Sequence, residues 1–290
     1  MTRALKKRLS KRLTESLPQN QVQICNSYDI VGDIAIIHLT EESRKHSNKI
    51  GTAIMAANKH VRTVLAQTSA VNGEFRLRKL KHVAGEKRTR TTHKESKCLF
   101  NVDVAKCYFS HRLSYERKRI ADQVVEGETV VNMFAGVGCF SILVAKNVKV
   151  EKVYSIDVNP LAIKYMRENV RMNGVYGTVV PILGDAGQII EEKLCGLADR
   201  VLMPLPEKAL EYLPYGLLSL KKTGGWIHFY DFEHAEKGKD VVEKVKTKVR
   251  KRLQSLDVAF EIPFGRKVRA TGPNWHQVVL DIKAKPTRSQ

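Results

Sequence analysis

The sequence predicts an α/β protein in which a parallel sheet flanked by helices follows a small α+β module. From Glu128 onward, apolar β-branched segments alternate with segments of helical periodicity, and this alternation is typical of a parallel sheet. A glycine-rich turn, Phe134–Gly138, follows the first apolar segment, as expected where a strand leads into a helix. Shorter and more basic strand-like segments precede Glu128. We therefore assign residues 1–127 to the α+β module and residues 128–290 to the sheet domain.

The module is expected to contain both helices and short strands. A basic helix is predicted over residues 1–20, where Pro18 closes it. The next segments are predicted to be a strand pair broken at Gly32, a helix, a basic strand, a stretch of strand-like alternation and a charged helix, over residues 28–39, 42–66, 74–81, 93–109 and 114–125.

The sheet domain is expected to contain five strand–helix units and a closing hairpin. Strands are predicted over residues 130–134, 152–157, 178–184, 200–205 and 225–230. Helices are predicted over residues 138–146, 160–173, 186–194, 207–218 and 235–253. The segments 259–268 and 275–282 predict an antiparallel hairpin, and a polar tail covers residues 283–290.

The glycine turn and the acidic residue that ends the next strand predict an adenosine cofactor. A dinucleotide-binding Rossmann turn has a third glycine, and Ser141 occupies that position here. S-adenosylmethionine carries no phosphate. It needs backbone room, which Gly136 and Gly138 supply, and a carboxylate for its ribose, which Asp157 supplies. We therefore expect a class I methyltransferase (Rossmann-like) sheet rather than an NAD-linked oxidoreductase, although two glycines can also serve only to make a tight turn.

The charge of the chain indicates a polyanionic partner. The formal net charge is +20 and the isoelectric point is near 9.8. The excess is denser before residue 128, notably in Arg76–His82 and Lys87–Arg90. Because no amphipathic helix carries aromatic anchors, nucleic acid is a better partner than a membrane surface. The module is therefore expected to bind RNA or DNA.

Other features exclude several classes of protein. No apolar segment follows the basic N-terminus, and the apolar run Val130–Ala145 is too short to span a bilayer, so we expect a cytoplasmic protein. The five cysteines are scattered and never spaced as C-x-x-C, so neither disulfides nor a metal site are predicted. His228 and His234 are expected to be structural or to face the substrate. We expect the protein to be monomeric.

The chain resembles the tRNA (guanine-N1)-methyltransferases of archaea and eukaryotes, which act on the guanosine 3′ of the anticodon, position 37. Five segments carry the resemblance: VNGEFRLRKLKHVAGEKRTRTTHKE (71–95), VDVAKCYFSHRLSYERKRI (102–120), NMFAGVGCFSI (132–142), SIDVNPLAIKYMRENVRMN (155–173) and GGWIHFYDF (224–232). It implies S-adenosyl-L-methionine as cofactor and the tRNA anticodon stem-loop as partner. It also implies transfer of a methyl group to guanine N1.

The resemblance assigns roles to residues of the module. Arg76 matches the arginine that stabilises O6 of the guanine, and Glu116 matches the base that removes the N1 proton. Read alone, Arg76 in a basic strand would contact a phosphate and Glu116 would form a surface ion pair. Tyr108 is expected to stack on a flipped base, and its strand neighbour Phe109 to pack in the core. Arg112 matches a contact to tRNA phosphate.

The remaining assignments concern the cofactor. Arg117 is expected to bind the cofactor carboxylate, and Asp185 to accept a hydrogen bond from the adenine amino group beside the Ala186 N–H. Without the resemblance, Asp185 reads as a helix N-cap, and both roles are compatible. The full set of expected cofactor residues is Arg117, Phe134, Gly136, Gly138, Asp157, Val158, Asp185, Ala186 and Pro204.

Three departures from the family pattern keep alternatives open. Pro204 stands where the family has asparagine, Asn132 stands where an acid is usual, and an additional N-terminal module for the tRNA elbow is expected to be absent. A wybutosine-pathway relative that methylates a tricyclic guanosine derivative stays open because of Pro204. Transfer of an aminocarboxypropyl group from the same cofactor is disfavoured by Arg112. A non-catalytic RNA-binding protein is disfavoured by the intact cofactor residues.

Overall fold

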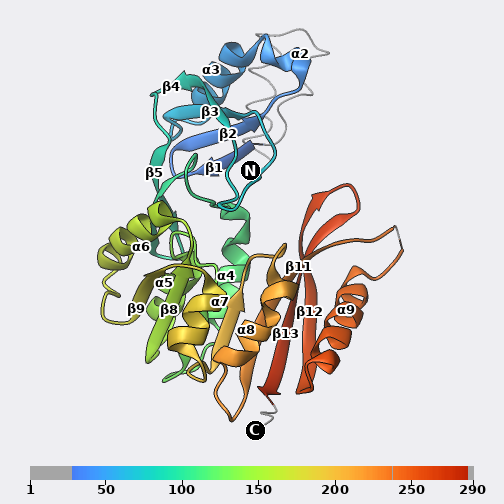
Figure 1. Ribbon diagram of the computed structural model, residues 1–290. Coiled ribbons are helices and arrows are strands. Elements are labelled where there is room, and N and C mark those ends of the chain that lie inside the picture. Colours follow the sequence, from blue (N-terminus) through green and yellow to red (C-terminus); the bar gives the residue numbers. More distant parts are fainter. Residues whose placement is uncertain (1–27, 237, 287–290) are drawn as a thin grey trace. The chain divides into compact units, whose positions relative to one another are not determined.

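The structure is a computed structural model that describes residues 28–236 and 238–286. The helix predicted over residues 1–20 lies outside these residues. The chain divides into two compact units, Met1–Arg112 and Leu113–Gln290 (Figure 1). Helix α4 (Ser114–Ala121) groups with the second unit, whereas the boundary after residue 127 stays a prediction based on sequence.

The first unit contains a four-stranded sheet in the order β1-β2-β3-β4 and a separate β5–β6 hairpin. Strands β2 and β3 are parallel, and the other pairs are antiparallel. The strands are β1 (Tyr28–Val31), β2 (Ile34–His38), β3 (Thr63–Gln67), β4 (Leu80–Gly85), β5 (Arg90–Glu95) and β6 (Cys98–Asp103), and the helices are α2 (Glu41–Arg44) and α3 (Ser47–Ala57). The strand pair predicted around Gly32 is confirmed by the β1–β2 pairing.

The helix predicted over residues 42–66 is wrong in its second half. Helix α3 ends at Ala57, and residues Thr63–Gln67 form strand β3 at the centre of the sheet. The reason is packing, because Val61, Val64 and Ala66 join the core that Ile50 and Ile54 of α3 also enter. β-Branched residues favour a strand once a neighbouring strand is available on each side.

The basic strand predicted over residues 74–81 is also wrong. Residues 72–77 form a tight turn in which Asn72 and Leu77 bridge, and β4 begins only at Leu80. Gly73 and Arg76 both have positive φ, 72° and 53°. The Asn-Gly pair is a strong turn signal that the apparent alternation of basic residues obscured.

The second unit is a seven-stranded sheet in the order β12-β13-β11-β10-β7-β8-β9. Strands β9, β8, β7, β10 and β11 are parallel, and β13 is antiparallel to both β11 and β12. The strands are β7 (Thr129–Asn132), β8 (Lys152–Asp157), β9 (Val179–Leu183), β10 (Arg200–Met203), β11 (Gly225–His234), β12 (Val258–Gly272) and β13 (Trp275–Pro286). The predicted parallel sheet and closing hairpin are confirmed, although β13 continues into the expected tail.

Helices cover both faces of this sheet (Figure 1). After α4 they are α5 (Cys139–Asn147), α6 (Pro160–Met172), α7 (Ala186–Ile189) with a π-helical turn η3 (Ile190–Leu194), α8 (Ala209–Ser219) and α9 (Val241–Ser255), and a 3₁₀ turn η2 (His111–Leu113) precedes α4. Pro160 and the Asn159 side chain, which accepts from the Leu161 N–H, begin α6.

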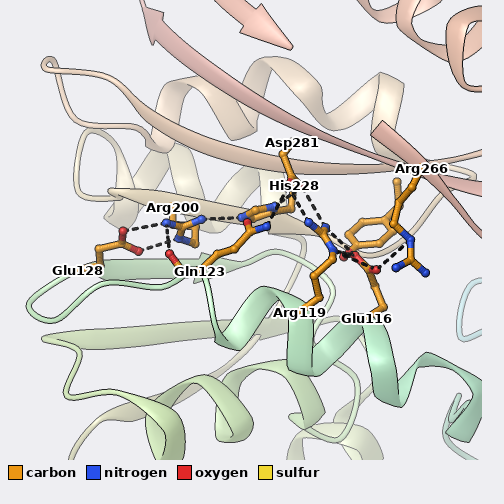
Figure 2. A network of polar contacts seen from close by, with 9 residues as sticks. Glu116, Arg119, Gln123, Glu128, Arg200, His228, Arg266 and Asp281 are labelled. Atoms are coloured by element: carbon orange, nitrogen blue, oxygen red, sulfur yellow. Dashed lines mark hydrogen bonds and ion pairs between the residues drawn. The ribbon is translucent and has the colours of Figure 1, made fainter. Parts of the chain in front are cut away.

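The two faces of the sheet differ in polarity. Ile227 and Phe229 of β11 belong to one continuous apolar core with residues of α7, α8 and α9. Because side chains alternate along a strand, His228 and Tyr230 point to the other face. The Tyr230 hydroxyl contacts Glu116 of α4, which lies on that face, and His228 contacts Asp281 of β13 and Arg200 of β10 (Figure 2). The alternation therefore separates an apolar face of the sheet from a polar one.

Candidate cofactor and active site

The expected cofactor residues lie at the carboxyl edge of the parallel strands of the second unit. Asn132 ends β7, Asp157 ends β8, and Pro204 follows β10 directly. Asp185 follows β9 and caps α7. In open parallel sheets, ligands bind in the crevice at this edge.

The glycine turn needs glycine for two physical reasons. Gly136 and Gly138 both have positive φ, 56° and 92°, a region that other residues rarely adopt. A Cβ at Gly138 would lie 2.7 Å from Met166 Cγ. Phe134 is half-buried at the start of the turn and packs edge-on against the Tyr212 ring, with ring centroids 5.3 Å apart. The turn is therefore compact, and the absence of side chains at residues 136 and 138 lets a ligand approach its backbone.

Asp157 holds the turn in place. Its Oδ2 accepts a hydrogen bond from the Gly136 N–H at 2.7 Å, and its Oδ1 accepts from the Asn159 N–H at 2.9 Å. Burial raises the pKa of Asp157, although the two backbone N–H groups partly offset this effect. Each oxygen has a further lone pair, so the carboxylate can also accept from ribose hydroxyls. Val158 lies half-buried beside it.

Asp185 makes one contact that the sequence predicted and one that it did not. Its Oδ1 accepts from the Gly187 and Gln188 N–H groups at 2.8 and 3.2 Å, so it is the N-cap of α7. Its Oδ2 accepts a hydrogen bond from the Tyr212 hydroxyl of α8, a contact that the sequence did not reveal. Burial, together with this bond, raises the pKa of Tyr212. The adjoining Ala186 is buried.

Asn132 offers a buried polar atom. The side chain is fully buried, and its Nδ2 donates to Ser141 Oγ at 3.0 Å. Among residues 28–236 and 238–286, Asn132 Oδ1 has no hydrogen-bond partner. A buried acceptor without a partner costs free energy unless a ligand or a water donates a hydrogen bond to it, and the amino group of S-adenosylmethionine is such a donor. The glycine turn, Asp157, Asp185 and Asn132 together therefore fit this cofactor. Pro204, half-buried, offers only its carbonyl.

Glu116 is buried, which excludes the surface ion pair as its explanation. Its side chain is 1% exposed, and its Oε1 accepts from Arg119 Nη2 at 2.7 Å and from the Tyr230 hydroxyl at 2.9 Å (Figure 2). Arg119 Nε lies 3.1 and 3.2 Å from Oε1 and Oε2, and Arg266 Nε lies 3.9 Å from Oε2. Oε2 is therefore the less engaged oxygen. Arg117, on the same helix, is also buried.

In the first unit, Arg76 and Tyr108 are brought together. The Arg76 guanidinium carbon lies 4.4 Å from the centroid of the Tyr108 ring. Tyr108 and Phe109 lie in a loop rather than on the predicted strand, and Phe109 is buried against His93. Arg78 Nη2 donates to the Phe109 carbonyl at 2.9 Å, which ties this loop to the residues after the Arg76 turn.

Arg112 is exposed and paired. Its Nε and Nη2 donate to Asp29 Oδ1 at 2.9 and 2.6 Å, and His111 Nε2 lies 3.8 Å from the same oxygen. Asp29 belongs to β1. A phosphate that binds Arg112 must therefore compete with a carboxylate of the protein.

Several residues of the polar face were not expected from the sequence as part of a site. Arg119 of α4 and Tyr230 of β11 bind Glu116, and Arg119 also binds Asp281 of β13 (Figure 2). His228 and Arg200 continue the contacts from Asp281. His228 is buried and hydrogen-bonded to Arg200 and Asp281, which agrees with a structural role, one of the two roles expected for it. One sequence signal could have indicated these contacts: His228 is a polar residue between the apolar residues of the strand segment Gly225–Tyr230.

Among residues 28–236 and 238–286, no helix is both long and apolar enough to cross a membrane. Over the same residues, no group of three or more histidine, cysteine or acidic side chains is arranged to hold a metal ion.

The sheet order and the residues at its carboxyl edge define a class I methyltransferase that uses S-adenosylmethionine. The chain belongs to the TRM5/TYW2 methyltransferases: the TRM5/TYW2 methyltransferase domain matches residues 91–259, and the TYW2 N-terminal domain matches residues 5–89. These matches also support the S-adenosylmethionine cofactor inferred from Gly136, Gly138 and Asp157.

Two relatives show equal identity but carry different names. The tRNA (guanine(37)-N(1))-methyltransferase Trm5b of Pyrococcus abyssi is 41% identical over 265 residues, which cover 89% of this chain and 74% of that protein. Its crystal structure has a TM-score of 0.82 at 39% identity and covers 93% of this chain and 78% of its own. The tRNA 4-demethylwyosine(37)-methyltransferase Taw21 of Saccharolobus solfataricus is 41% identical over 279 residues, which cover 96% of this chain and 99% of that protein. The structure of the complex of aTrm5 and tRNALeu has a TM-score of 0.80 at 35% identity, over 96% of this chain and 78% of that one.

Proposed function

We propose that this protein transfers a methyl group from S-adenosylmethionine to N1 of guanosine 37 in tRNA, next to the anticodon. The proposal is supported by the identity to Trm5b over 89% of the chain and by the net charge of +20. The bound cofactor supplies an electrophilic methyl group. The chain's own residues must then hold the guanine, stabilise the charge on O6 and remove the N1 proton.

The observation that carries the proposal is the buried carboxylate of Glu116. Its Oε1 is held by Arg119 and Tyr230, and its Oε2 has only longer contacts. Guanine N1 keeps its proton at neutral pH, so methylation needs an oriented base. In the proposal, Glu116 Oε2 accepts that proton.

Arg76 and Tyr108 are proposed to bind the target base. A guanidinium near O6 stabilises the negative charge that develops there as N1 loses its proton. The Tyr108 ring beneath the guanidinium, 4.4 Å from ring centroid to guanidinium carbon, restricts how Arg76 can point. Arg112 and the basic residues of the first unit are proposed to contact phosphates of the anticodon stem-loop.

On the cofactor side, we propose that Asp157 holds the ribose and Asp185 the adenine. Phe134, Gly136, Gly138, Val158 and Ala186 form the walls, Pro204 contributes its carbonyl, and Arg117 binds the carboxylate. We further propose that the protein acts as a cytoplasmic monomer, in agreement with the sequence-based expectation.

A second candidate acceptor is 4-demethylwyosine at the same position of tRNA. Pro204 favours it, because proline cannot donate or accept through a side chain where the guanosine-specific pattern has asparagine. The identity to Taw21, 41% over 96% of the chain, supports it as well. The two candidates share the cofactor, the tRNA position and the need for a base.

The test offers both acceptors to the purified protein. One tRNA transcript carries guanosine at position 37, a matched transcript carries adenosine there, and a third tRNA carries 4-demethylwyosine. Radiolabelled methyl transfer gives the rate, and mass spectrometry of the digested nucleosides identifies the product. We expect 1-methylguanosine from the first tRNA and no product from the adenosine transcript.

The nucleoside product separates the candidates. If only the third tRNA is methylated, the acceptor is 4-demethylwyosine and not guanosine 37. A nucleoside carrying an aminocarboxypropyl group, or no modified nucleoside at all, would contradict both.

A further inference from the structure

Glu116 is one end of a chain of buried polar contacts that crosses the polar face of the sheet (Figure 2). Arg119 binds Glu116 and also donates through Nη1 and Nη2 to Asp281 Oδ2 and Oδ1, at 2.6 and 3.0 Å. Asp281 Oδ1 is 2.7 Å from His228 Nδ1. Arg200 Nη1 is 2.7 Å from His228 Nε2, and Arg200 also binds Glu128. Glu128 lines an open cavity of about 750 Å³, where the network meets solvent.

The contacts fix the state of His228. Arginine can only donate, so Nε2 accepts from Arg200 and the single proton lies on Nδ1, which donates to Asp281. His228 and Asp281 are also direct partners in the β11–β13 register. Burial lowers the pKa of His228 in spite of Asp281, so the ring stays neutral. It therefore orients Asp281 without adding charge.

Charge in the network is balanced when Glu116 is ionised. Glu116, Asp281 and Glu128 oppose Arg119, Arg200 and Arg266, three carboxylates against three guanidinium groups. The groups that face Glu116 itself are Arg119 from α4, Tyr230 from β11 and Arg266 from β12. Asp281 is the only other carboxylate that Arg119 contacts in the described part of the chain.

We propose that Asp281, oriented by His228, is a positioning residue that shares the Arg119 guanidinium with Glu116. This sharing fixes the direction of Arg119 and prevents its whole charge from stabilising the ionised Glu116. Glu116 therefore stays oriented, and part of the Arg119 charge is directed to Asp281 instead. The inference rests on the proposed role of Glu116 as the base.

Two variants should change the proton affinity of Glu116 in opposite directions. Asp281→Asn removes the competing negative charge, so Arg119 stabilises the Glu116 carboxylate more strongly and its titration moves to lower pH. Tyr230→Phe removes a hydrogen bond that stabilises the carboxylate, so its titration moves to higher pH. Each shift should be on the order of one pH unit.

The first readout needs neither tRNA nor activity. Infrared difference spectra of each protein against its Glu116→Gln counterpart report the ionisation of Glu116 as the pH is changed. Asp231→Asn is the matched control, because Asp231 is a buried β11 carboxylate that pairs with Lys248 at 2.7 Å, outside the network. It should leave the Glu116 titration where it is in the wild type.

The second readout is the single-turnover rate of methyl transfer against pH. The rate should fall on the acidic side with the Glu116 titration, and this limb should move down in Asp281→Asn and up in Tyr230→Phe. At neutral pH, Asp281→Asn should lose about tenfold in rate or more. Thermal unfolding and cofactor affinity confirm that each variant is folded.

The outcomes distinguish the inference from the proposed function. Infrared titrations that do not move, or that move in one direction in both variants, overturn the inference. Titrations that shift as expected while the wild type methylates no tRNA support the sharing of Arg119 and contradict only the proposed function.

Discussion

The guanidinium of Arg76 lies over the ring of Tyr108, with 4.4 Å between the guanidinium carbon and the ring centroid. Arg76 reaches this position from a turn in which its own φ is 53°, a left-handed conformation that costs about 1 kcal/mol or more outside glycine. Such strain persists only where the surrounding structure requires it. Here it aims a cation at the stacking surface proposed for the base.

Arg76→Ala is expected to lower the single-turnover rate of methyl transfer about 100-fold while cofactor affinity stays near that of the wild type, because O6 loses its cation. Rates at saturating tRNA and calorimetric binding of S-adenosylmethionine measure the two effects. Lys81→Ala is the control, since Lys81 is an exposed cation on β4. Equal losses in both variants would mean that Arg76 serves only as a basic contact.

Glu116→Gln is expected to lower the same rate about 100-fold without loss of cofactor binding, because the amide keeps the shape of the side chain but accepts no proton. Glu128→Gln changes the carboxylate at the other end of the network and should lower the rate less. A Glu116→Gln enzyme as fast as the wild type would show that Glu116 is a structural ion-pair residue.

The stability of the second unit is expected to fall on acidification, through His228. Burial lowers the pKa of His228, so the unfolded chain takes up a proton below about pH 6.5 that the folded chain does not. The contribution of the neutral His228 to the free energy of unfolding is therefore fully present above that pH. It is lost as the pH falls below it, with a slope of up to about 1.4 kcal/mol per pH unit.

Urea unfolding between pH 7.5 and 5 measures this slope. His228→Asn should reduce it, because asparagine does not titrate in this range. His276→Asn, on the more accessible β13 residue His276, is the matched histidine control. An identical slope in wild type and His228→Asn would show that His228 is charged in the folded protein.

Pro204→Asn is expected to raise the rate on guanosine 37 relative to the rate on 4-demethylwyosine. The asparagine restores a side-chain donor and acceptor after β10, at the edge of the cofactor site. Competition between the two tRNAs in one reaction, read by nucleoside mass spectrometry, gives the ratio directly. A ratio that does not change would remove position 204 from the determinants of acceptor choice.

Gly138→Ala is expected to destabilise the protein more than Gly174→Ala. Both glycines have positive φ, 92° and 67°, so both substitutions strain the backbone by about 1 kcal/mol. Only at Gly138 does the new methyl group collide, at 2.7 Å from Met166 Cγ, whereas nothing lies within 4 Å of it at Gly174. Thermal unfolding compares the two, and equal losses would show that the turn adapts.

The cofactor half was predictable because its signals are local. The strand–helix alternation, the glycine turn and Asp157 each follow from a few neighbouring residues, and the sheet confirms the predicted parallel strands and hairpin. In the first unit, the strand β3 at Thr63–Gln67 depends on partners on both sides, β2 and β4, so local periodicity misassigned it as a helix.

Two features of the candidate site residues, one in each unit, were not predicted from the sequence. His228 and Asp281 are 53 positions apart and meet only through the register of β11 and β13. Arg76 lies in a left-handed turn that no propensity assigns to arginine. The first feature arises from the pairing of distant strands, which a single sequence does not display. The second is a local turn whose Asn72-Gly73 signal was obscured by the alternation of basic residues.

The pairing of Arg112 with Asp29 has a consequence for how tRNA binding responds to salt. A phosphate that neutralises a free arginine releases mobile counterions, and this release makes affinity fall steeply with ionic strength. Arg112 already has a counterion, Asp29, that is covalently part of the protein and cannot diffuse away. Phosphate binding here exchanges one fixed partner for another. The salt dependence of tRNA affinity should therefore be shallower than the number of contacting basic residues suggests, and Asp29→Asn should steepen it.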